Sequence, residues 1–222
     1  MSLLHAETSY PLVKRLVDPS EAEVEQATKV LVDAFKGDPF TNILVGGNMD
    51  LEPLQLGANI RAALIGGQVH VITLGPQPED IVGVALWYPP GSSSFSSEEE
   101  RAAGWNQFLE AAPDDLRKWW TDYFIPSMTR LNADTLGSGY THNSWHLHIF
   151  GVMRARHRKG YGKALYRLVE KQAKETHSSI VLETTTVLDV QIYQRLGLGV
   201  RGEIDIESNY GKAHIWLMSK EN

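Results

Sequence analysis

A short basic segment with two closely spaced glycines is chemically the most distinctive stretch of the sequence. Residues 154–163 read Arg-Ala-Arg-His-Arg-Lys-Gly-Tyr-Gly-Lys, six Lys or Arg fall between Arg154 and Arg167, and no Asp or Glu occurs from Thr135 to Val169. Glycines at a helix start let backbone N–H groups approach an anion, and the helix dipole favours negative charge there. The segment therefore predicts a phosphate-binding loop, with a solvated charged turn as the alternative. It is neither a P-loop nor the three-glycine dinucleotide fingerprint.

Two histidines lie two residues apart just before this segment. The sequence Trp-His-Leu-His-Ile places His146 and His148 at alternate positions of an expected strand. Alternate strand residues point to one face, so we expect both imidazoles to project together while Leu147 and Ile149 face the other side. An unperturbed imidazole pKa of about 6.5 suits a proton acceptor near neutral pH. With His142 the spacing also resembles a metal site, but no Asp or Glu lies nearby in the sequence, and we predict no metal.

Alternating strands and helices are expected to position these residues. The expected strands are 11–17, 69–74, 81–87, 145–152, 179–185, 204–206 and 213–218. The expected helices are 24–35, 52–64, 160–175 and 189–196. Asp18 is a candidate cap for the first helix, with Pro19 in its first turn. Strand–helix–strand alternation favours an α/β fold with a mixed sheet.

The segment from Gly91 to Ser144 has a different character from the rest of the chain. A Ser-rich loop leads into two expected helices, 98–112 and 114–133, which hold three of the six Trp residues, Trp105, Trp119 and Trp120. Two interpretations are compatible with this composition. The helices form a hairpin packed on the core, or a lid whose aromatic faces line a pocket.

The glycine motif and a second segment resemble a known family. The loop resembles the acetyl-CoA-binding pattern Gln/Arg-x-x-Gly-x-Gly/Ala of the GCN5-related N-acetyltransferases (GNAT), with His157 at the Gln/Arg position. Residues 189–198 resemble the family segment Asn-x-x-Phe-Tyr-x-x-x-Gly-Phe, with Asp189 for Asn and Leu198 for Phe. The overall spacing is similar to that of puromycin N-acetyltransferases, and the His-Leu-His strand resembles that of serotonin (arylalkylamine) N-acetyltransferases.

The resemblance implies a fold and a set of functional residues. The implied fold is a single domain over residues 1–222, with a mixed, mostly antiparallel sheet flanked by helices and a helical insertion at about 91–144 before the motif strand. Acetyl-CoA is the implied co-substrate. Its pantetheine arm would contact the backbone of Phe150, Gly151, Val152 and Met153. Its pyrophosphate would lie on the loop formed by His157, Arg158, Lys159, Gly160, Tyr161, Gly162 and Lys163, and Asp189 is assigned to the same site.

The chemistry of acetyl transfer assigns further roles within this resemblance. Tyr193 is the candidate acid, because a phenol of pKa about 10 is protonated at neutral pH and can donate to a departing thiolate. His146 and His148 are the candidate bases, with His146 slightly favoured. Glu183 would orient an amine or act as an alternative base. Alternatively, it is a structural carboxylate whose hydrogen bonds are made within the sheet. The expected acceptor-binding residues are Phe35, Phe40, Trp87, Tyr88 and Glu183, although the aromatic ones could equally be core.

Composition limits the remaining possibilities. The chain has 222 residues, 42% hydrophobic residues, no cysteine and a net charge of -6. These values exclude a disordered chain, a disulfide framework and a thiol nucleophile, and they argue against nucleic-acid binding. We see neither a signal peptide nor an apolar run of ~18 residues, so we expect a cytoplasmic protein without membrane contact.

The resulting prediction is an enzyme that transfers acetyl from acetyl-CoA to a primary amine of a small molecule. Without a cysteine nucleophile, we expect direct attack in a ternary complex. A catalytically silent acyl-CoA sensor and a peptide or protein acetyltransferase are the alternatives. The sequence leaves the oligomeric state open.

Overall fold

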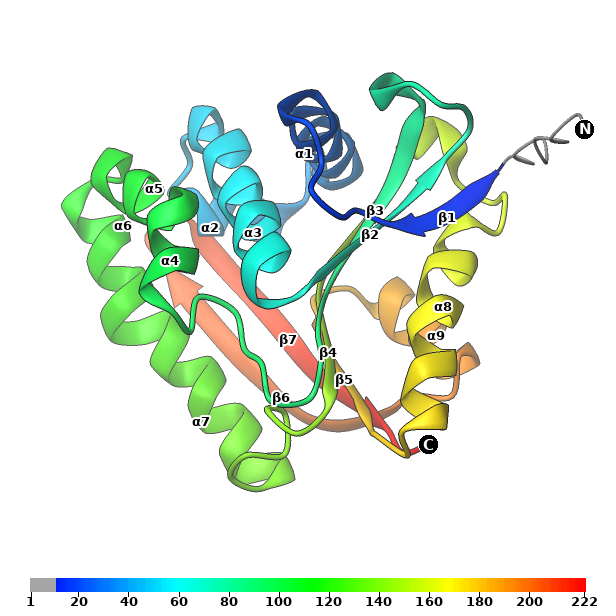
Figure 1. The fold of residues 1–222 in the computed structure, drawn as a ribbon. Helices are drawn as coiled ribbons and strands as arrows, with labels where there is room; N and C mark the ends of the chain where they lie inside the picture. The colour runs from blue at the N-terminus through cyan, green and yellow to red at the C-terminus, as the bar shows by residue number, and fades with distance from the viewer. Residues whose placement is uncertain (1–10) are drawn as a thin grey trace, which may run out of the picture.

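A seven-stranded sheet with helices on both faces forms the centre of the protein (Figure 1). A computed structural model describes residues 11–222. The strand order is β1-β2-β3-β4-β5-β7-β6, and only the β4–β5 pair is parallel. The predicted mixed, mostly antiparallel sheet is therefore confirmed. The strands are β1 (Leu12–Arg15), β2 (Gln68–Thr73), β3 (Ile81–Tyr88), β4 (Trp145–Val152), β5 (Ile180–Thr184), β6 (Gly199–Ser208) and β7 (Gly211–Lys220).

The helices outside the insertion include one that the sequence did not predict. They are α1 (Glu21–Phe35), α2 (Pro39–Leu44), α3 (Glu52–Gly66), α8 (Tyr161–Glu175) and α9 (Val187–Arg195). The unpredicted helix is α2, which lies between the first two expected helices, 24–35 and 52–64. Asp38 starts this helix, because its carboxylate accepts a hydrogen bond from the Thr41 N–H at 2.8 Å and Pro39 occupies the first position.

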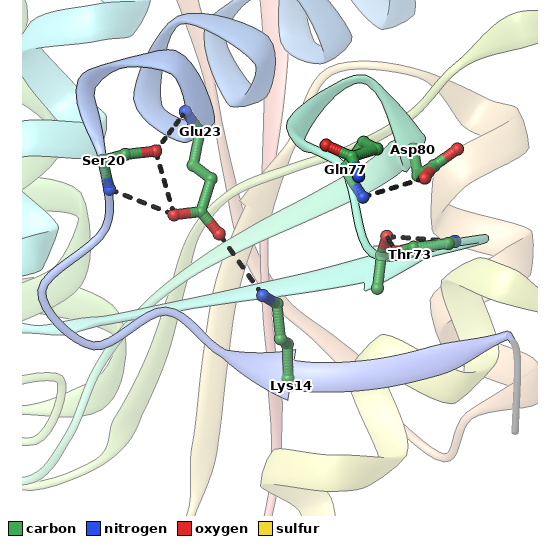
Figure 2. Close-up of polar contacts among 7 residues, drawn as sticks. Lys14, Ser20, Glu23, Thr73, Gln77 and Asp80 are labelled. Carbon is green, nitrogen blue, oxygen red and sulfur yellow. Dashed lines mark hydrogen bonds and ion pairs between the residues drawn. The ribbon is translucent and has the colours of Figure 1, made fainter. Parts of the chain in front are cut away.

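The start of α1 differs from the prediction by two residues. Ser20, not Asp18, caps the helix: the Glu23 N–H donates to the Ser20 hydroxyl, and the Ser20 N–H donates to the Glu23 carboxylate at 3.0 Å (Figure 2). This reciprocal capping box satisfies two backbone donors, whereas Asp18 lies before it at a φ of 47°. Lys14 on β1 pairs with Glu23 at 3.3 Å and ties the first strand to the helix.

Two apolar clusters hold the helices to opposite faces of the sheet. On one face α8 and α9 pack through Leu165, Val169 and Tyr193 against strand residues such as Leu147 and Leu182. On the other face α1 and α3 pack against β2 and β3, in a cluster made of Val24, Ala27, Val30, Leu31, Leu56, Ile60, Ala63, Val69, Val71, Val84 and Leu86 among others. Figure 1 shows these two helix layers on either side of the sheet.

A chain of helices between β3 and β4 forms the predicted insertion. It comprises α4 (Glu98–Glu100), η3 (Arg101–Trp105), α5 (Asn106–Ala111), α6 (Asp114–Lys118), η4 (Trp119–Phe124) and α7 (Ile125–Leu136). Trp105, Phe108 and Trp120 are buried in one cluster with Val45, Leu51 and Ala58. These three aromatic residues are therefore the core that attaches the insertion to α2 and α3, as the packed-hairpin interpretation expects. The helix α7 covers another part of the sheet, where Leu131 packs against Val181 of β5 and Leu217 of β7.

Candidate active site

The strand β4 contains a one-residue bulge at His148. Leu147 lies opposite Trp87 and Ile149 lies opposite the adjacent Leu86, so His148 is an extra residue on β4. The expectation that Leu147 and Ile149 share a face is wrong: Leu147 is in the α8 cluster, whereas Ile149 packs with the α1 and α3 cluster. An extra residue resets the alternation of a strand, and here the reset falls directly after the two histidines.

Next to the bulge, β4 separates from its parallel neighbour. The β4–β5 pairing covers only Trp145–Leu147 against Ile180–Leu182. The Met153 N–H donates to the Val82 carbonyl at 2.9 Å, and antiparallel alternation then turns the backbone groups of Phe150 and Val152 away from β3. The structure thus opens a gap in the sheet whose β4 edge presents the N–H and C=O groups of Phe150 and the N–H group of Val152.

The basic loop ends in an uncapped helix start. The helix α8 has no side-chain cap, Gly160 precedes it at a φ of 80°, and Arg158 has a φ of 61°. The first N–H groups of a helix lack internal partners, and successive N–H groups with alternating backbone handedness form an anion-binding concavity. Arg158, Lys159 and Lys163 are exposed around it. These residues fit a phosphate group, as acetyl-CoA would require.

Other residues of the predicted co-substrate site have hydrogen-bond partners within the protein. The His157 Nε2–H donates to the Val152 carbonyl at 2.8 Å, so the loop folds back on the open edge of β4. Both backbone groups of Met153 have partners within the protein, Val82 and Arg156. The Asp189 carboxylate accepts from the Thr186 hydroxyl at the start of α9.

His146 and Glu183 form a close pair at the inner end of the gap. The His146 Nε2 atom lies 2.7 Å from the Glu183 Oε2 atom, and the two side chains are 16% and 20% exposed. Burial lowers the pKa of His146, but the Glu183 charge and hydrogen bond outweigh burial and leave this pKa above its usual value. Burial raises the pKa of Glu183, but His146 and a bond from Asn132 hold that pKa at about 2. The carboxylate is therefore ionised and increases the basicity of His146.

A polar chain from the insertion fixes the second oxygen of Glu183. The Asn132 Nδ2–H group donates to Glu183 Oε1 at 2.9 Å. The Thr141 hydroxyl donates in turn to Asn132 Oδ1 at 2.6 Å, which sets the orientation of that amide. With both oxygens held, Glu183 presents one fixed acceptor to His146, so the free nitrogen of the His146 ring is Nδ1.

His148 has a different partner and a different proton affinity. Its Nε2–H donates to Asn59 Oδ1 at 2.8 Å, and Asn59 donates to the Gln55 carbonyl at 2.8 Å. Burial and the positive charge of His146 lower the pKa of His148 to about 3, while Glu183 opposes them only in part. His148 is thus neutral near pH 7, with its Nδ1 lone pair free.

Tyr193 lies on the other face of the sheet from the histidines. It projects from α9 into the α8 cluster and is 9% exposed. Burial, with the nearby Asp189 charge and Tyr166, raises the pKa of the Tyr193 phenol above its usual value. The phenol therefore keeps its proton throughout the physiological range.

The expected acceptor-binding aromatic residues do not all gather near the histidines. Trp87 is fully buried against Trp145 and Tyr166 on the α8 face, away from the histidine side. Tyr88 is also fully buried, but its ring lies edge-on to His148 with centroids 5.6 Å apart. Phe35 and Phe40, at the α1–α2 junction, are half-buried. Phe40 contacts Phe124 of η4.

Three polar residues of the site were missed by sequence analysis. Asn59 lies on α3, Asn132 lies on α7, and Thr141 lies in the following loop. The signal for Asn59 in the sequence is a polar residue at a position of α3 whose neighbours on the same helix face are mostly apolar. Nothing in the local sequence distinguishes Asn132 or Thr141.

The structure does not bring together the three histidines whose spacing resembles a metal site. His142 is exposed and hydrogen-bonds to Ser93 at 3.0 Å, apart from His146 and His148. Within residues 11–222 there is no group of three or more His, Asp or Glu side chains placed to hold a metal ion. No helix in this range is long and apolar enough to cross a membrane.

A known protein family resembles this chain in sequence, and known structures resemble it in fold. Residues 85–198 match the sequence model described as Acetyltransferase (GNAT) family. No curated protein sequence matches the chain. Similar solved structures include that of a histone acetyltransferase HPA2 and related acetyltransferase from Corynebacterium glutamicum, at 21% identity and a TM-score of 0.60, covering 95% of this chain and 96% of that one.

Two further structures come from insects. The polyamine N-acetyltransferase of Drosophila melanogaster, which forms N-acetylagmatine, is 15% identical with a TM-score of 0.61, covering 95% of this chain and 99% of that one. The mosquito arylalkylamine N-acetyltransferase like 5b is 17% identical with a TM-score of 0.61, covering 95% and 100%. At these identities the likeness establishes the fold, and the sequence match establishes membership: the chain belongs to the GNAT family of acetyltransferases.

Proposed function

We propose that the protein transfers the acetyl group of acetyl-CoA to a primary amine of a small molecule. The observation that carries this proposal is the His146–Glu183 pair, held at 2.7 Å at the inner end of the gap between β4 and β5. A basic imidazole at this point can take a proton from an amine that attacks a thioester lying in the gap.

Two groups of backbone donors and acceptors support acetyl-CoA as the co-substrate. Phe150 offers its N–H and C=O groups, and Val152 its N–H group, on the open edge of β4 to the amides of the pantetheine arm, whereas the Val152 carbonyl already accepts from His157. The uncapped start of α8 and the flanking Arg158 and Lys163 fit the pyrophosphate. Acetyl-CoA supplies an activated acetyl group, a thioester whose carbonyl carbon accepts the nucleophile and whose thiol leaves.

Two side chains of the protein then transfer protons, one as an acceptor and one as a donor. His146 Nδ1 accepts the proton that the amine loses as its nitrogen bonds to the carbonyl carbon, directly or through water. Tyr193 donates a proton to the sulfur as the carbon–sulfur bond breaks. No cysteine is present to form an acyl-enzyme, so the attack is direct and both substrates are bound together.

The similar structures support a small amine as the acceptor. One is named for polyamines and agmatine, and another for arylalkylamines. The half-buried Phe35 and Phe40 lie on α1 and α2 and offer apolar walls for such a molecule. A catalytically silent acyl-CoA sensor and a peptide or protein acetyltransferase are the alternatives that experiment has to exclude.

Thiol release from acetyl-CoA over a panel of amines and peptides tests the proposal. We expect turnover with at least one small primary amine, and intersecting double-reciprocal lines when both substrates are varied. The His146→Gln variant should bind acetyl-CoA normally and lose turnover. Tight acetyl-CoA binding without turnover of any amine would favour the sensor, turnover of peptides alone would favour the other alternative, and parallel lines would contradict direct attack.

A further inference from the structure

A buried carboxylate without a partner lies on the same helix face as the residue that holds His148. Glu52, in the first turn of α3, is only 4% exposed, and its Oε1 atom is buried with no hydrogen-bond partner. Burying a charged group without a partner is costly, so such groups normally find one. The α3 dipole favours a carboxylate in the first turn, but it supplies no hydrogen-bond partner for the buried Oε1 atom.

The geometry of α3 directs Glu52 toward the interior of the site. Glu52, Gln55 and Asn59 are spaced at i, i+3 and i+7, so they share one face of the helix, and all three are buried. This face lies between the α1-side cluster, to which Leu56 belongs, and the insertion cluster, to which Leu51 belongs. Since Asn59 reaches His148 from this face, Glu52 lies on the side of α3 that faces the histidines, between the two clusters.

A second carboxylate lies close to Glu52, and no basic side chain of residues 11–222 forms an ion pair with either of them. Burial and the nearby Asp38 charge raise the pKa of Glu52 above its usual value. Asp38 lies between Phe35 and Phe40 at the α1–α2 junction, where one of its oxygens accepts from Thr41. Within residues 11–222, neither Glu52 nor Asp38 takes part in an ion pair. The pair would therefore be stabilised by a positively charged ligand.

We propose that Glu52, with Asp38, binds a second, distal cationic group of the acceptor, which makes the preferred acceptor a linear diamine or polyamine. The inference rests on the proposed acetyltransferase function. Seven residues separate Glu52 from Asn59, and a rise of 1.5 Å per residue places them about 10 Å apart along α3. An acceptor whose reacting nitrogen lies at the histidines would thus carry its second nitrogen roughly 10 Å away.

The chain supplies a matched control for this site in Glu100. Its side chain is also buried, at 2% exposure, and it also has one oxygen without a partner. Its other oxygen, however, accepts from the hydroxyls of Ser96 and Ser97 at the start of α4. It lies beside Gly66, at the opposite end of α3 from Glu52. Substitution there tests for general effects of losing a buried carboxylate.

The test compares hexamethylenediamine with hexylamine, which differ only in the second amino group. We expect the wild-type protein to prefer the diamine in kcat/KM by about tenfold or more, as a charged hydrogen bond provides. Glu52→Gln should abolish this preference mainly through KM and leave hexylamine within about twofold, whereas Glu100→Gln should keep the preference. The kcat/KM for octamethylenediamine should also fall in Glu52→Gln. The kcat/KM for putrescine, whose nitrogens are closer together, should fall less.

Several outcomes would overturn the inference and leave the proposed function intact. The first is an equal kcat/KM of the wild-type protein for the diamine and the monoamine. The second is an equal loss of kcat/KM for both amines in Glu52→Gln, and the third is loss of the diamine preference in Glu100→Gln. Failure of every amine would instead remove the proposed function as well. Should Glu52→Gln not fold, inhibition of the wild-type protein by hexamethonium decides: the inference requires it to inhibit more strongly than hexyltrimethylammonium.

Discussion

Replacing Glu183 with Gln should shift the pH dependence of catalysis, because this carboxylate sets the proton affinity of His146. Two unit charges about 4 Å apart attract by about 4 kcal/mol at an effective dielectric of about 20, and by about 1 kcal/mol in water. The hydrogen-bonded atoms are 2.7 Å apart and the side chains are 16% and 20% exposed, so we expect a value nearer the first figure. Glutamine keeps the shape and a hydrogen-bond acceptor but removes this attraction.

The assay is the initial rate of thiol release as a function of pH, expressed as kcat/KM for the amine. The base must be neutral to accept a proton, so kcat/KM should rise with pH through the pKa of His146. The Glu183 charge raises that pKa above 6.5, and the acid limb of the wild-type profile should lie above this value. In Glu183→Gln the limb should move to lower pH and the plateau should fall, by less than the roughly 10²–10⁴-fold loss expected for removing the base in His146→Gln.

A second histidine–glutamate pair provides the control for this experiment. His214 and Glu203 lie 3.4 Å apart on the β6–β7 hairpin, where Glu203 is well exposed. Glu203→Gln should leave the acid limb unchanged, because this pair is outside the site. An acid limb that stays in place in Glu183→Gln, or that moves equally in both variants, would show that His146 is not the base controlled by Glu183.

Three further predictions concern the candidate acid Tyr193, the cap of α1 and the buried His70. Tyr193→Phe should lower kcat by about 10²–10⁴-fold while calorimetry shows an unchanged acetyl-CoA Kd; equal losses of both would exclude this residue as the acid. Ser20→Ala should reduce the free energy of unfolding in urea by about 1 kcal/mol, because the cap of α1 is lost, and an unchanged value would contradict the capping role. Burial and the Arg15 charge lower the pKa of His70 to about 4, so only the unfolded chain binds this proton between about pH 6.5 and 4. Stability should therefore fall as the pH decreases through this window, less steeply in His70→Gln, and parallel curves for the two proteins would refute this cause.

The predictable parts of the site are those that depend on neighbouring residues in the sequence. A strand bearing two histidines and a basic glycine loop before a helix are local patterns, and the structure has both. The partners of the histidines are not local: Asn59 is 89 residues from His148, and Glu183 is 37 residues from His146. Such contacts depend on how helices and strands pack, which no local pattern specifies.

The bulge is the clearest case of a feature that local periodicity predicts wrongly. A strict two-residue period placed Ile149 with Leu147, whereas the extra residue at His148 moves Ile149 to the opposite face. The residues at the bulge are Leu147, His148 and Ile149, and none of them is a glycine or proline that would have indicated a bulge.

The two histidines acquire opposite proton affinities on one short strand because their partners differ in charge. His146 donates to a carboxylate, which favours the imidazolium, whereas His148 donates to the neutral amide of Asn59, which does not. Their ring centroids are 5.7 Å apart, so a proton on His146 further disfavours one on His148. In the proposed reaction, a proton taken from the amine would therefore be localised on His146, and His148 would stay neutral with a lone pair that can order a water molecule. The carboxylate of Glu183 thus makes His146 the more basic of the two imidazoles, which is the property that the proposed mechanism requires of the base.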